Sequence, residues 1–225
     1  MRWSRSLLPE PVVAAGLALS FVLFGLTFRG PRARFWQRMT RTGLALGSLA
    51  LAVERPLRRT RFGWHDVLIG LGSAGILYSV FQVGDRLARL ILPQGSAEIG
   101  AIYGLETLRP RQELAARLAF IIGPAEELFW RGLLQARFMR RYGTVPGLVL
   151  ATAAYGGAHI VTGNLTLIAA ATVAGAFWGA LAALGVPPGA LIISHSTWDV
   201  FTFLVAPTAP REFSADPRIH TNEHE

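Results

Sequence analysis

The chain has no cysteine and no lysine, and it has few charged residues of either sign. Without cysteine it forms no disulfide and has no thiolate to bind a metal or act as a nucleophile. All 22 basic residues are therefore arginines, and the charged fraction of 16% is well below the roughly 25% of a soluble domain. These absences exclude cysteine chemistry and disfavour an ordinary soluble protein.

Long apolar runs take the place of the missing charges. Hydrophobic residues make up 52% of the chain, and the mean hydropathy is +0.39. A membrane-spanning helix needs about 20 apolar residues, with about 17 as the lower limit. The runs predict an all-α, polytopic integral membrane bundle of about six to eight transmembrane or re-entrant helices. The candidate segments are 12–28, 42–53, 67–83, 114–136, 145–162, 165–186 and 189–206.

The arginines gather at the ends of these runs. A pI near 11.2 in a soluble protein would suggest nucleic acid, but arginines at segment ends fit the positive-inside rule and anionic lipid headgroups better. We therefore expect contact with membrane lipids and no nucleic acid. Placing the basic stretches 55–61 and 137–141 inside predicts that 67–83 and 114–136 form one out-and-back pair.

The segment 42–53 is the shortest candidate, with 12 residues. A helix of that length measures about 18 Å, which is too short to cross a bilayer. It is a re-entrant piece, an interfacial piece, or part of a helix extended through Arg38 and Arg41. Basic residues on both of its flanks disfavour a simple crossing.

No linker or composition shift marks a second soluble domain. We expect N-terminal membrane helices and arginine-rich loops over 1–113, a helical core with the chemistry over 114–206, and a polar, disordered tail over 207–225. Arg2 and Arg5 before an apolar run resemble a signal peptide. No small-x-small cleavage site follows, so we expect a retained first helix.

Six ionisable residues interrupt the apolar segments between 118 and 206, apart from the basic loop at 137–141. A central Arg or Asp costs about 2.5–3.5 kcal/mol in a membrane helix, so such groups are normally paired, hydrated or turned inward. Six of them within three segments predict one shared polar site. They are Glu126, Glu127, Arg131, His159, His195 and Asp199.

Spacings of four residues support this shared site. Glu127 and Arg131 lie on one helix face and are expected to pair, whereas Glu126 points about 100° away from Glu127. Small residues in "AAYGGAHI" allow the helices to approach closely. Two further pairs of polar residues have the same spacing: Tyr155 with His159, and His195 with Asp199.

Each of these features also has a structural interpretation. Glu127 with Arg131 is most simply a buried ion pair, His159 a hydrogen-bonded core histidine, and His195 with Asp199 a helix-packing pair. The combination favours a functional site, because a structural ion pair needs no second acid beside it.

The residue types suggest activation of water, in one of two versions. In the first, Glu126 is the general base with His159 as its partner, and His195 and Asp199 stabilise an oxyanion or orient the substrate carbonyl. In the second, a glutamate such as Glu126 binds zinc or another divalent metal together with His159 and His195, and the metal lowers the pKa of bound water. The spacings do not choose between the two.

Three short motifs stand in order on successive apolar segments: "EELFWR" (126–131), "YGGAH" (155–159) and "HSTWD" (195–199). Together they resemble the CPBP intramembrane protease family. That family includes type II CAAX prenyl endopeptidases, the Ras-converting enzyme, and Abi-type bacteriocin-processing and self-immunity proteins. The resemblance covers about 114–205 and says little about the first 110 residues.

The resemblance implies a helical membrane core with a water-filled cavity open toward the cytoplasm, and we expect a location in a bacterial plasma membrane. It implies hydrolysis of a membrane-associated peptide, prenylated or bearing a leader. By motif position, Glu126 and His159 carry over as the water-activating pair, and Glu127 as the second acid held by Arg131. His195 and Asp199 carry over as the pair of the third motif.

Two residues depart from the family pattern. Tyr155 stands where phenylalanine is common, and its hydroxyl adds a hydrogen-bonding group near His159. Asp199 stands where asparagine is common, and an ionised Asp199 is a poor oxyanion donor. This departure gives weight to metal binding or to orientation of His195.

Two other functions remain open. A non-enzymatic self-immunity or membrane scaffold protein could use the same fold, with the motifs as a peptide-binding cavity. A proton or ion carrier also uses buried Glu and His, but the sequence lacks the internal repeat that is typical of transporters.

Overall fold

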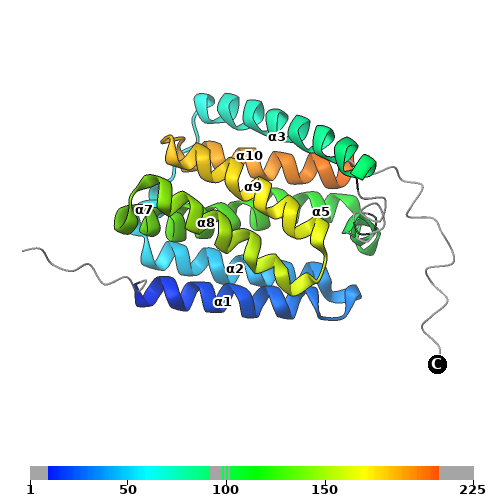
Figure 1. Cartoon of the computed structure of the whole chain (residues 1–225), viewed down its shortest axis with the longest axis horizontal. Helices are drawn as coiled ribbons and strands as arrows, with labels where there is room; N and C mark the ends of the chain where they lie inside the picture. Colours follow the sequence, from blue (N-terminus) through cyan, green and yellow to red (C-terminus); the bar gives the residue numbers. More distant parts are fainter. Residues whose placement is uncertain (1–9, 92–97, 99, 101, 208–225) are drawn as a thin grey trace, which may run out of the picture.

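The computed structural model describes residues 10–91, 98, 100 and 102–207. Over these residues the chain is helical throughout, without a strand, and its long helices pack side by side (Figure 1). The predicted all-α class is confirmed. From residue 208 onward the predicted tail lies outside the described residues, as do Arg2 and Arg5.

The first two helices form an antiparallel pair. Helix α1 spans Pro11–Phe28 and begins with a proline, whose fixed φ and missing N–H suit a first turn. Helix α2 spans Phe35–Val53 and returns beside α1, and the hydroxyls of Thr27 and Thr42 lie 3.0 Å apart between the two helices. The segment 42–53 is therefore part of a longer helix extended through Arg38 and Arg41, one of the three predicted possibilities.

Among the described residues, four helices are long and apolar enough to cross a membrane: Pro11–Phe28, Trp64–Leu87, Thr144–Thr162 and Leu165–Ala183. By the length and composition of these helices the chain is an integral membrane protein. Helix α2 is not among the four. It nevertheless lies beside α1 and extends along the same length of the bundle. The stretches 29–41 and 55–61 therefore lie at opposite ends of the bundle.

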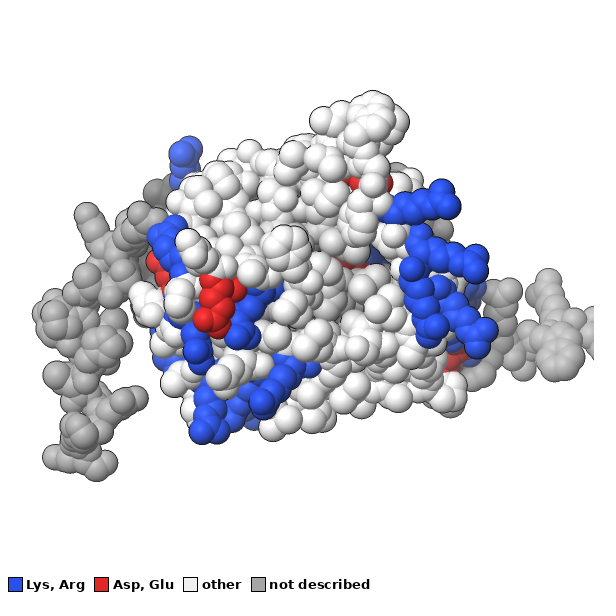
Figure 2. Space-filling model, turned by 180° about the vertical axis from the view of Figure 1, so that it is seen from behind, with Lys and Arg blue, Asp and Glu red and all other residues white. Residues whose placement is uncertain are grey.

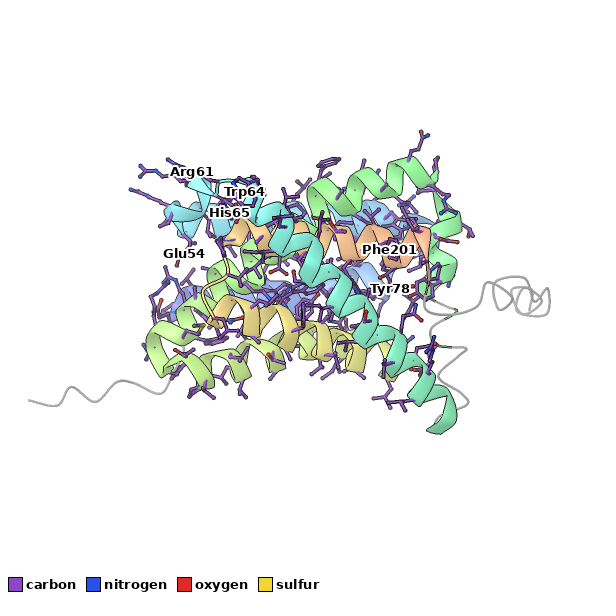
Figure 3. All side chains as sticks on the ribbon, turned by 90° about the horizontal axis from the view of Figure 1, so that it is seen from above. Glu54, Arg61, Trp64, His65, Tyr78 and Phe201 are labelled. Carbon is purple, nitrogen blue, oxygen red and sulfur yellow. The ribbon has the colours of Figure 1, made fainter. Side chains whose placement is uncertain are left out.

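The remaining helices enclose the centre of the chain. Helices α8 (Thr144–Ala158) and α9 (Leu165–Ala183) pack on each other, and α10 (Pro188–Val200) packs on α3 (Trp64–Ile91). Figure 3 shows Tyr78 of α3 beside Phe201 at the end of α10, with ring centroids 5.0 Å apart. Gly70 makes the close packing of α3 and α10 possible, because an added Cβ would lie 2.6 Å from a methyl carbon of Ile193.

The rod 111–142 runs through the middle of the bundle and carries the first motif. It contains α5 (Arg111–Arg117), α6 (Gly123–Glu126) and α7 (Ala136–Tyr142), joined by π-helical stretches at Leu118–Ile122 and Glu127–Gln135. Pro124 gives a physical reason for the first stretch. Its ring would clash with the carbonyl four residues earlier in a regular α-helix, and a wider turn relieves that clash.

The two ends of the bundle differ in their polar contacts. At one end Glu54 binds both Arg137 and Arg140, at 2.7 and 2.8 Å, and Arg137 also pairs with Glu10. We call this the ion-pair end; the opposite end contains residues 29–36 and 102–108. Figure 2 shows arginines at both ends and few charged residues on the face seen between them.

Two hydrophobic clusters meet near the rod. The larger one includes Phe24, Trp130 and Tyr155, and the smaller one consists of Leu77, Ala174 and Trp178 with partly buried neighbours. The buried ionisable residues lie where these clusters adjoin.

Candidate active site

A cavity of about 720 Å³ lies beside the rod and contains the predicted site. Its wall includes Glu126, His159, His195 and Asp199, and the rest of the wall is mainly apolar and aromatic. Residues of the end opposite the ion pairs complete the wall: Phe28, Arg32, Trp36, Asp85, Tyr103 and Asn164. We call this the cavity end.

The predicted ion pair between Glu127 and Arg131 is present. The Arg131 Nη1 lies 2.9 Å from the Glu127 Oε1, and both side chains are almost completely buried. The Arg131 Nη2 also donates to the carbonyl of Gly175 at 3.2 Å. The guanidinium lies over the rings of Tyr155 and Trp178, 4.7 and 5.4 Å from their centroids, so its charge is balanced on several sides.

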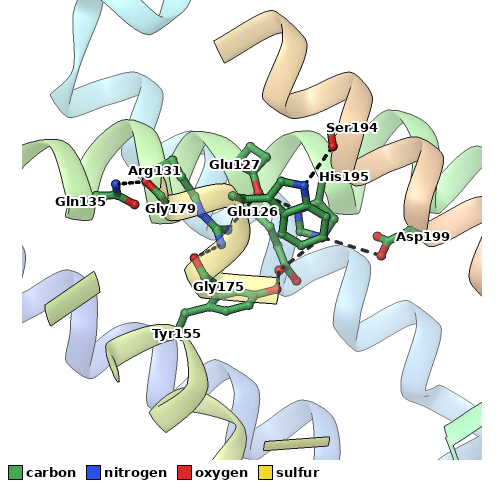
Figure 4. Close-up of polar contacts among 11 residues, drawn as sticks. Glu126, Glu127, Arg131, Gln135, Tyr155, Gly175, Gly179, Ser194, His195 and Asp199 are labelled. Carbon is green, nitrogen blue, oxygen red and sulfur yellow. Dashed lines mark hydrogen bonds and ion pairs between the residues drawn. The ribbon is translucent and has the colours of Figure 1, made fainter. Parts of the chain in front are cut away.

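His195 is held mainly by Glu127, a contact that the sequence did not predict. Its Nδ1 lies 2.7 Å from the Glu127 Oε1 and donates to it, since a carboxylate beside Arg131 accepts hydrogen bonds. Its ring stacks on Trp178 with 3.8 Å between centroids and a 16° interplanar angle. The Nε2 therefore points away from Glu127 (Figure 4), toward Asp199 at 3.7 Å and Glu126 at 4.0 Å.

Glu126 is bonded to Tyr155, whereas the sequence predicts His159 as its partner in activating a water. The Tyr155 hydroxyl donates to the Glu126 Oε2 at 2.7 Å (Figure 4). Among the described residues no hydrogen bond or ion pair joins Glu126 to His159, so their joint action on a water stays a prediction. Tyr155 lies one helical turn before His159, and its longer side chain reaches the carboxylate first.

His159 lines the same cavity at the end of α8. Its Nδ1 donates to the backbone carbonyl of Tyr155 at 2.9 Å, and its ring meets Phe24 edge-on at 5.1 Å. The helix gives way to a 3₁₀ turn at His159–Thr162, which ends at Gly163 with φ of +67°. With its Nδ1 proton used in this way, a neutral His159 keeps an unprotonated Nε2.

The three residues predicted as possible metal ligands do not converge. Among the described residues no group of three His, Asp or Glu side chains is arranged to hold a metal ion. The Glu126 Oε2 and the His195 Nε2 lie 4.0 Å apart, and in the described chain no hydrogen bond or ion pair joins His159 to either residue. We therefore derive no step through a metal.

Two donors in the cavity wall were not assigned a role from the sequence. The Trp198 Nε1 and the Thr202 Oγ1 are buried, and within the described part of the chain neither has a hydrogen-bond partner. Buried donors are normally satisfied, so these two are suited to a bound water or substrate. In the sequence, only helical spacing could have indicated that these two side chains lie near Asp199. Thr202 follows Asp199 by three residues and Trp198 by four.

Residues 113–201 match the family model of the Rce1-like type II CAAX prenyl endopeptidases. The chain carries a domain of this CPBP family. No curated protein and no solved structure matches the chain significantly.

The CPBP-family domain extends from α5 to the end of α10 and includes the three motifs. Helices α1 to α3 lie outside the match, yet they complete the site. Phe28 of α1, Trp36 of α2 and Phe81 of α3 all line the cavity. The N-terminal helices therefore shape the space in which the family motifs lie.

The position of the cavity bears on the predicted orientation. The stretches 55–61 and 137–141 lie together at the ion-pair end, as Glu54 contacts Arg137 and Arg140. The cavity is lined by residues of the opposite end. A cytoplasmic location of both basic stretches would put the ion-pair end inside, whereas a cytoplasmic opening at the cavity end would put the opposite end there, and both stay predictions.

Proposed function

We propose that the chain is an intramembrane endopeptidase that hydrolyses a peptide bond of a membrane-associated protein. The observation that carries this proposal is that two adjacent carboxylates have different contacts. Glu127 is occupied by Arg131 and His195, whereas Glu126 faces the cavity and, within the described chain, accepts one hydrogen bond, from Tyr155. Membership of the CPBP family supports a protease and a protein substrate.

In the proposed reaction, Glu126 is the general base. It takes a proton from a water that attacks the peptide carbonyl, and it returns the proton to the amine that leaves when the C–N bond breaks. The Glu126 Oε2 and the His195 Nε2 are 4.0 Å apart, a spacing that one water bridges. Glu127 and Trp178 hold the imidazole of His195 in place for this contact.

The developing oxyanion needs donors, and Asp199 supplies none when ionised. Trp198 and Thr202 provide two donors in the same wall, and the Nε2 of His159 faces the cavity as a further position for the water or substrate. We assign Asp199 to orientation of His195, from 3.7 Å.

The cavity suits a substrate with a large apolar part. Its wall contains many aromatic side chains, among them Phe28, Phe35, Trp36, Phe81 and Phe203. This supports a prenylated peptide or a hydrophobic leader as the substrate. We place the protein in a bacterial plasma membrane with the cavity end in the cytoplasm, as the resemblance to the CPBP family implies for the cavity.

The test is cleavage of quenched fluorescent peptides, prenylated or leader-like, by protein in liposomes. We expect Glu126→Gln and His159→Ala to lower the rate by on the order of 100-fold or more. Glu113→Gln is the matched control, because Glu113 lies on the same rod but outside the cavity, paired with Arg117 at 2.8 Å. Full activity of folded Glu126→Gln would contradict the proposal.

Two further measurements separate the alternatives. Stoichiometric zinc in purified protein, lost in His195→Ala, would favour the metal-bound version of the site. Single cysteines in the stretches 29–41 and 55–61, labelled from one side of the membrane, decide the orientation. The chain has no cysteine of its own, so each label reports one position.

A further inference from the structure

The connection between α2 and α3 is a dense basic segment outside the family domain. Four of the seven residues in 55–61 are arginines, and all four are exposed. Arg58 is partly used, since its Nε donates to the carbonyl of Leu51 at 2.7 Å. Within the described part of the chain, no hydrogen bond or ion pair involves the side chains of Arg55, Arg59 or Arg61.

Exposed aromatic residues follow these arginines directly. Phe62 is 59% exposed and Trp64 is 66% exposed, at the start of the apolar stretch Trp64–Leu87. Figure 3 shows Arg61, Trp64 and His65 together at the beginning of α3, with Glu54 nearby. Exposed aromatic rings at the start of a spanning helix lie at headgroup level, where neighbouring arginines reach lipid phosphates.

The segment has an ordered backbone. A 3₁₀ turn spans Arg55–Arg59, and the Asp66 carboxylate accepts the backbone N–H of Gly63 at 2.8 Å before the first turn of α3. The guanidinium groups are thus presented from a fixed frame, which lowers the entropic cost of gathering several of them on one anion.

Two glycines join this segment to the helices of the candidate site. Leu57 lies on Gly132 of the rod, where an added Cβ would be 2.8 Å from a Leu57 methyl carbon. The carbonyl oxygen of Arg61 lies on Gly189 at the start of α10, 2.4 Å from the position of an added Cβ. Gly132 adjoins Arg131, and α10 carries His195.

We propose that residues 55–64 form a binding site for the phosphate-bearing headgroup of an anionic phospholipid, and that its occupancy adjusts the candidate site through Leu57 and the Arg61 carbonyl. The binding half of the proposal stands by itself. The coupling half rests on the proposed peptidase function. Charge complementarity and the aromatic residues at headgroup level select a membrane lipid over a soluble anion.

The binding test compares two triple variants of the full chain in detergent. Arg55→Gln, Arg59→Gln and Arg61→Gln remove three exposed charges here. Arg34→Gln, Arg41→Gln and Arg86→Gln remove three exposed charges elsewhere, and none of those residues lines the cavity. Native mass spectrometry measures retention of added phosphatidylglycerol against phosphatidylcholine, and the melting temperature is measured with each lipid and with inorganic phosphate.

We expect the unmodified chain to prefer phosphatidylglycerol. An arginine near an anionic surface contributes about fivefold in binding, so the first triple variant should lose on the order of 10- to 100-fold of that preference and the second should keep it. Equal losses in both triple variants would mean unspecific charge attraction and overturn the site. An equal rise of the melting temperature with inorganic phosphate alone would overturn the assignment to a lipid.

The coupling test uses cleavage rates in liposomes with and without phosphatidylglycerol. The unmodified chain should change its rate with the anionic lipid. Leu57→Ala keeps every charge and should retain lipid binding but lose this response. A rate that is the same in both liposomes would overturn the coupling. Absence of cleavage in both would contradict the proposed function, while the binding result would still decide the lipid site.

Discussion

Arginines at the ion-pair end and at the cavity end of the bundle bind different partners. At the ion-pair end, Arg137 and Arg140 bind carboxylates, and Glu54 serves both. At the cavity end, Arg29 donates to the carbonyl of Val161 at 3.0 Å and Arg111 donates to that of Leu204. Helix ends leave such carbonyls without partners, and the guanidinium fork satisfies them.

This difference separates stability from the candidate chemistry. Glu126 and Asp199 belong to the cavity wall. Within the described chain, neither carboxylate forms an ion pair with a surface arginine. Arg29 and Arg111 of the cavity end are anchored on backbone carbonyls and take no carboxylate from the cavity. At the ion-pair end, carboxylates form ion pairs that hold α1, α2 and α7 together.

The largest expected effect contrasts a buried arginine with a partly exposed one. Arg131→Met leaves Glu127 buried without its cation, so we expect a loss of about 3–5 kcal/mol in the free energy of unfolding. Arg137→Met breaks a partly exposed cluster and should cost about 1 kcal/mol or less. Unfolding in mixed detergent micelles measures both. Equal losses of unfolding free energy would remove the distinction between the buried and the partly exposed arginine.

An intermediate effect contrasts two buried threonines. Thr202→Val removes a hydroxyl that has no partner in the described chain, so stability should hold while peptide cleavage falls about tenfold. Thr42→Val breaks the contact with Thr27 and should cost about 1 kcal/mol of stability, with cleavage retained. Cleavage rates and thermal melts of both variants give the comparison. A Thr202→Val protein that cleaves normally would remove Thr202 from the site.

The smallest effect concerns Glu98 at the cavity end. The Thr166 hydroxyl and backbone N–H both donate to its carboxylate, at 2.5 and 2.8 Å, and lower the pKa of Glu98 from its ordinary value of 4.5. The ionised form is therefore favoured by folding, and its contribution is present above pH 4.5 and lost as the pH falls through the lowered pKa. We expect Glu98→Gln to melt slightly below the unmodified protein at neutral pH, and the gap to close in acid. A gap that is independent of pH would contradict this assignment.

Much of the fold was predictable, because apolar runs report membrane helices directly. The seven predicted segments correspond to seven helical rods in the described chain. The segment 42–53 alone is too short to cross a membrane, and the sequence leaves open whether the helix extends through Arg38 and Arg41. Arg41 is exposed and Arg38 donates to the carbonyl of Leu26, so neither charge enters the core.

The site was predictable where contacts are local. The pair of Glu127 and Arg131 follows from spacing along one helix. The contact of His195 with Glu127 joins residues 68 positions apart and leaves no such signal. The sequence predicts His159 as the partner of Glu126 and misses the contact with Tyr155. Spacing along the chain does not show which side chain of a neighbouring helix reaches the carboxylate. The catalytic roles of these residues stay predictions.

The π-helical stretches have a consequence for how the chain tolerates changes in length. A π turn holds about one residue more than an α turn, so deleting one residue within Leu118–Ile122, together with replacing Pro124 to avoid its ring clash, lets that stretch wind as an ordinary α-helix. The parts of the rod on either side then keep their faces. The same deletion in the regular helix α3 would rotate everything beyond it by about 100°. The segment just before Glu126 is therefore a place where homologous chains can differ in length without moving the glutamate.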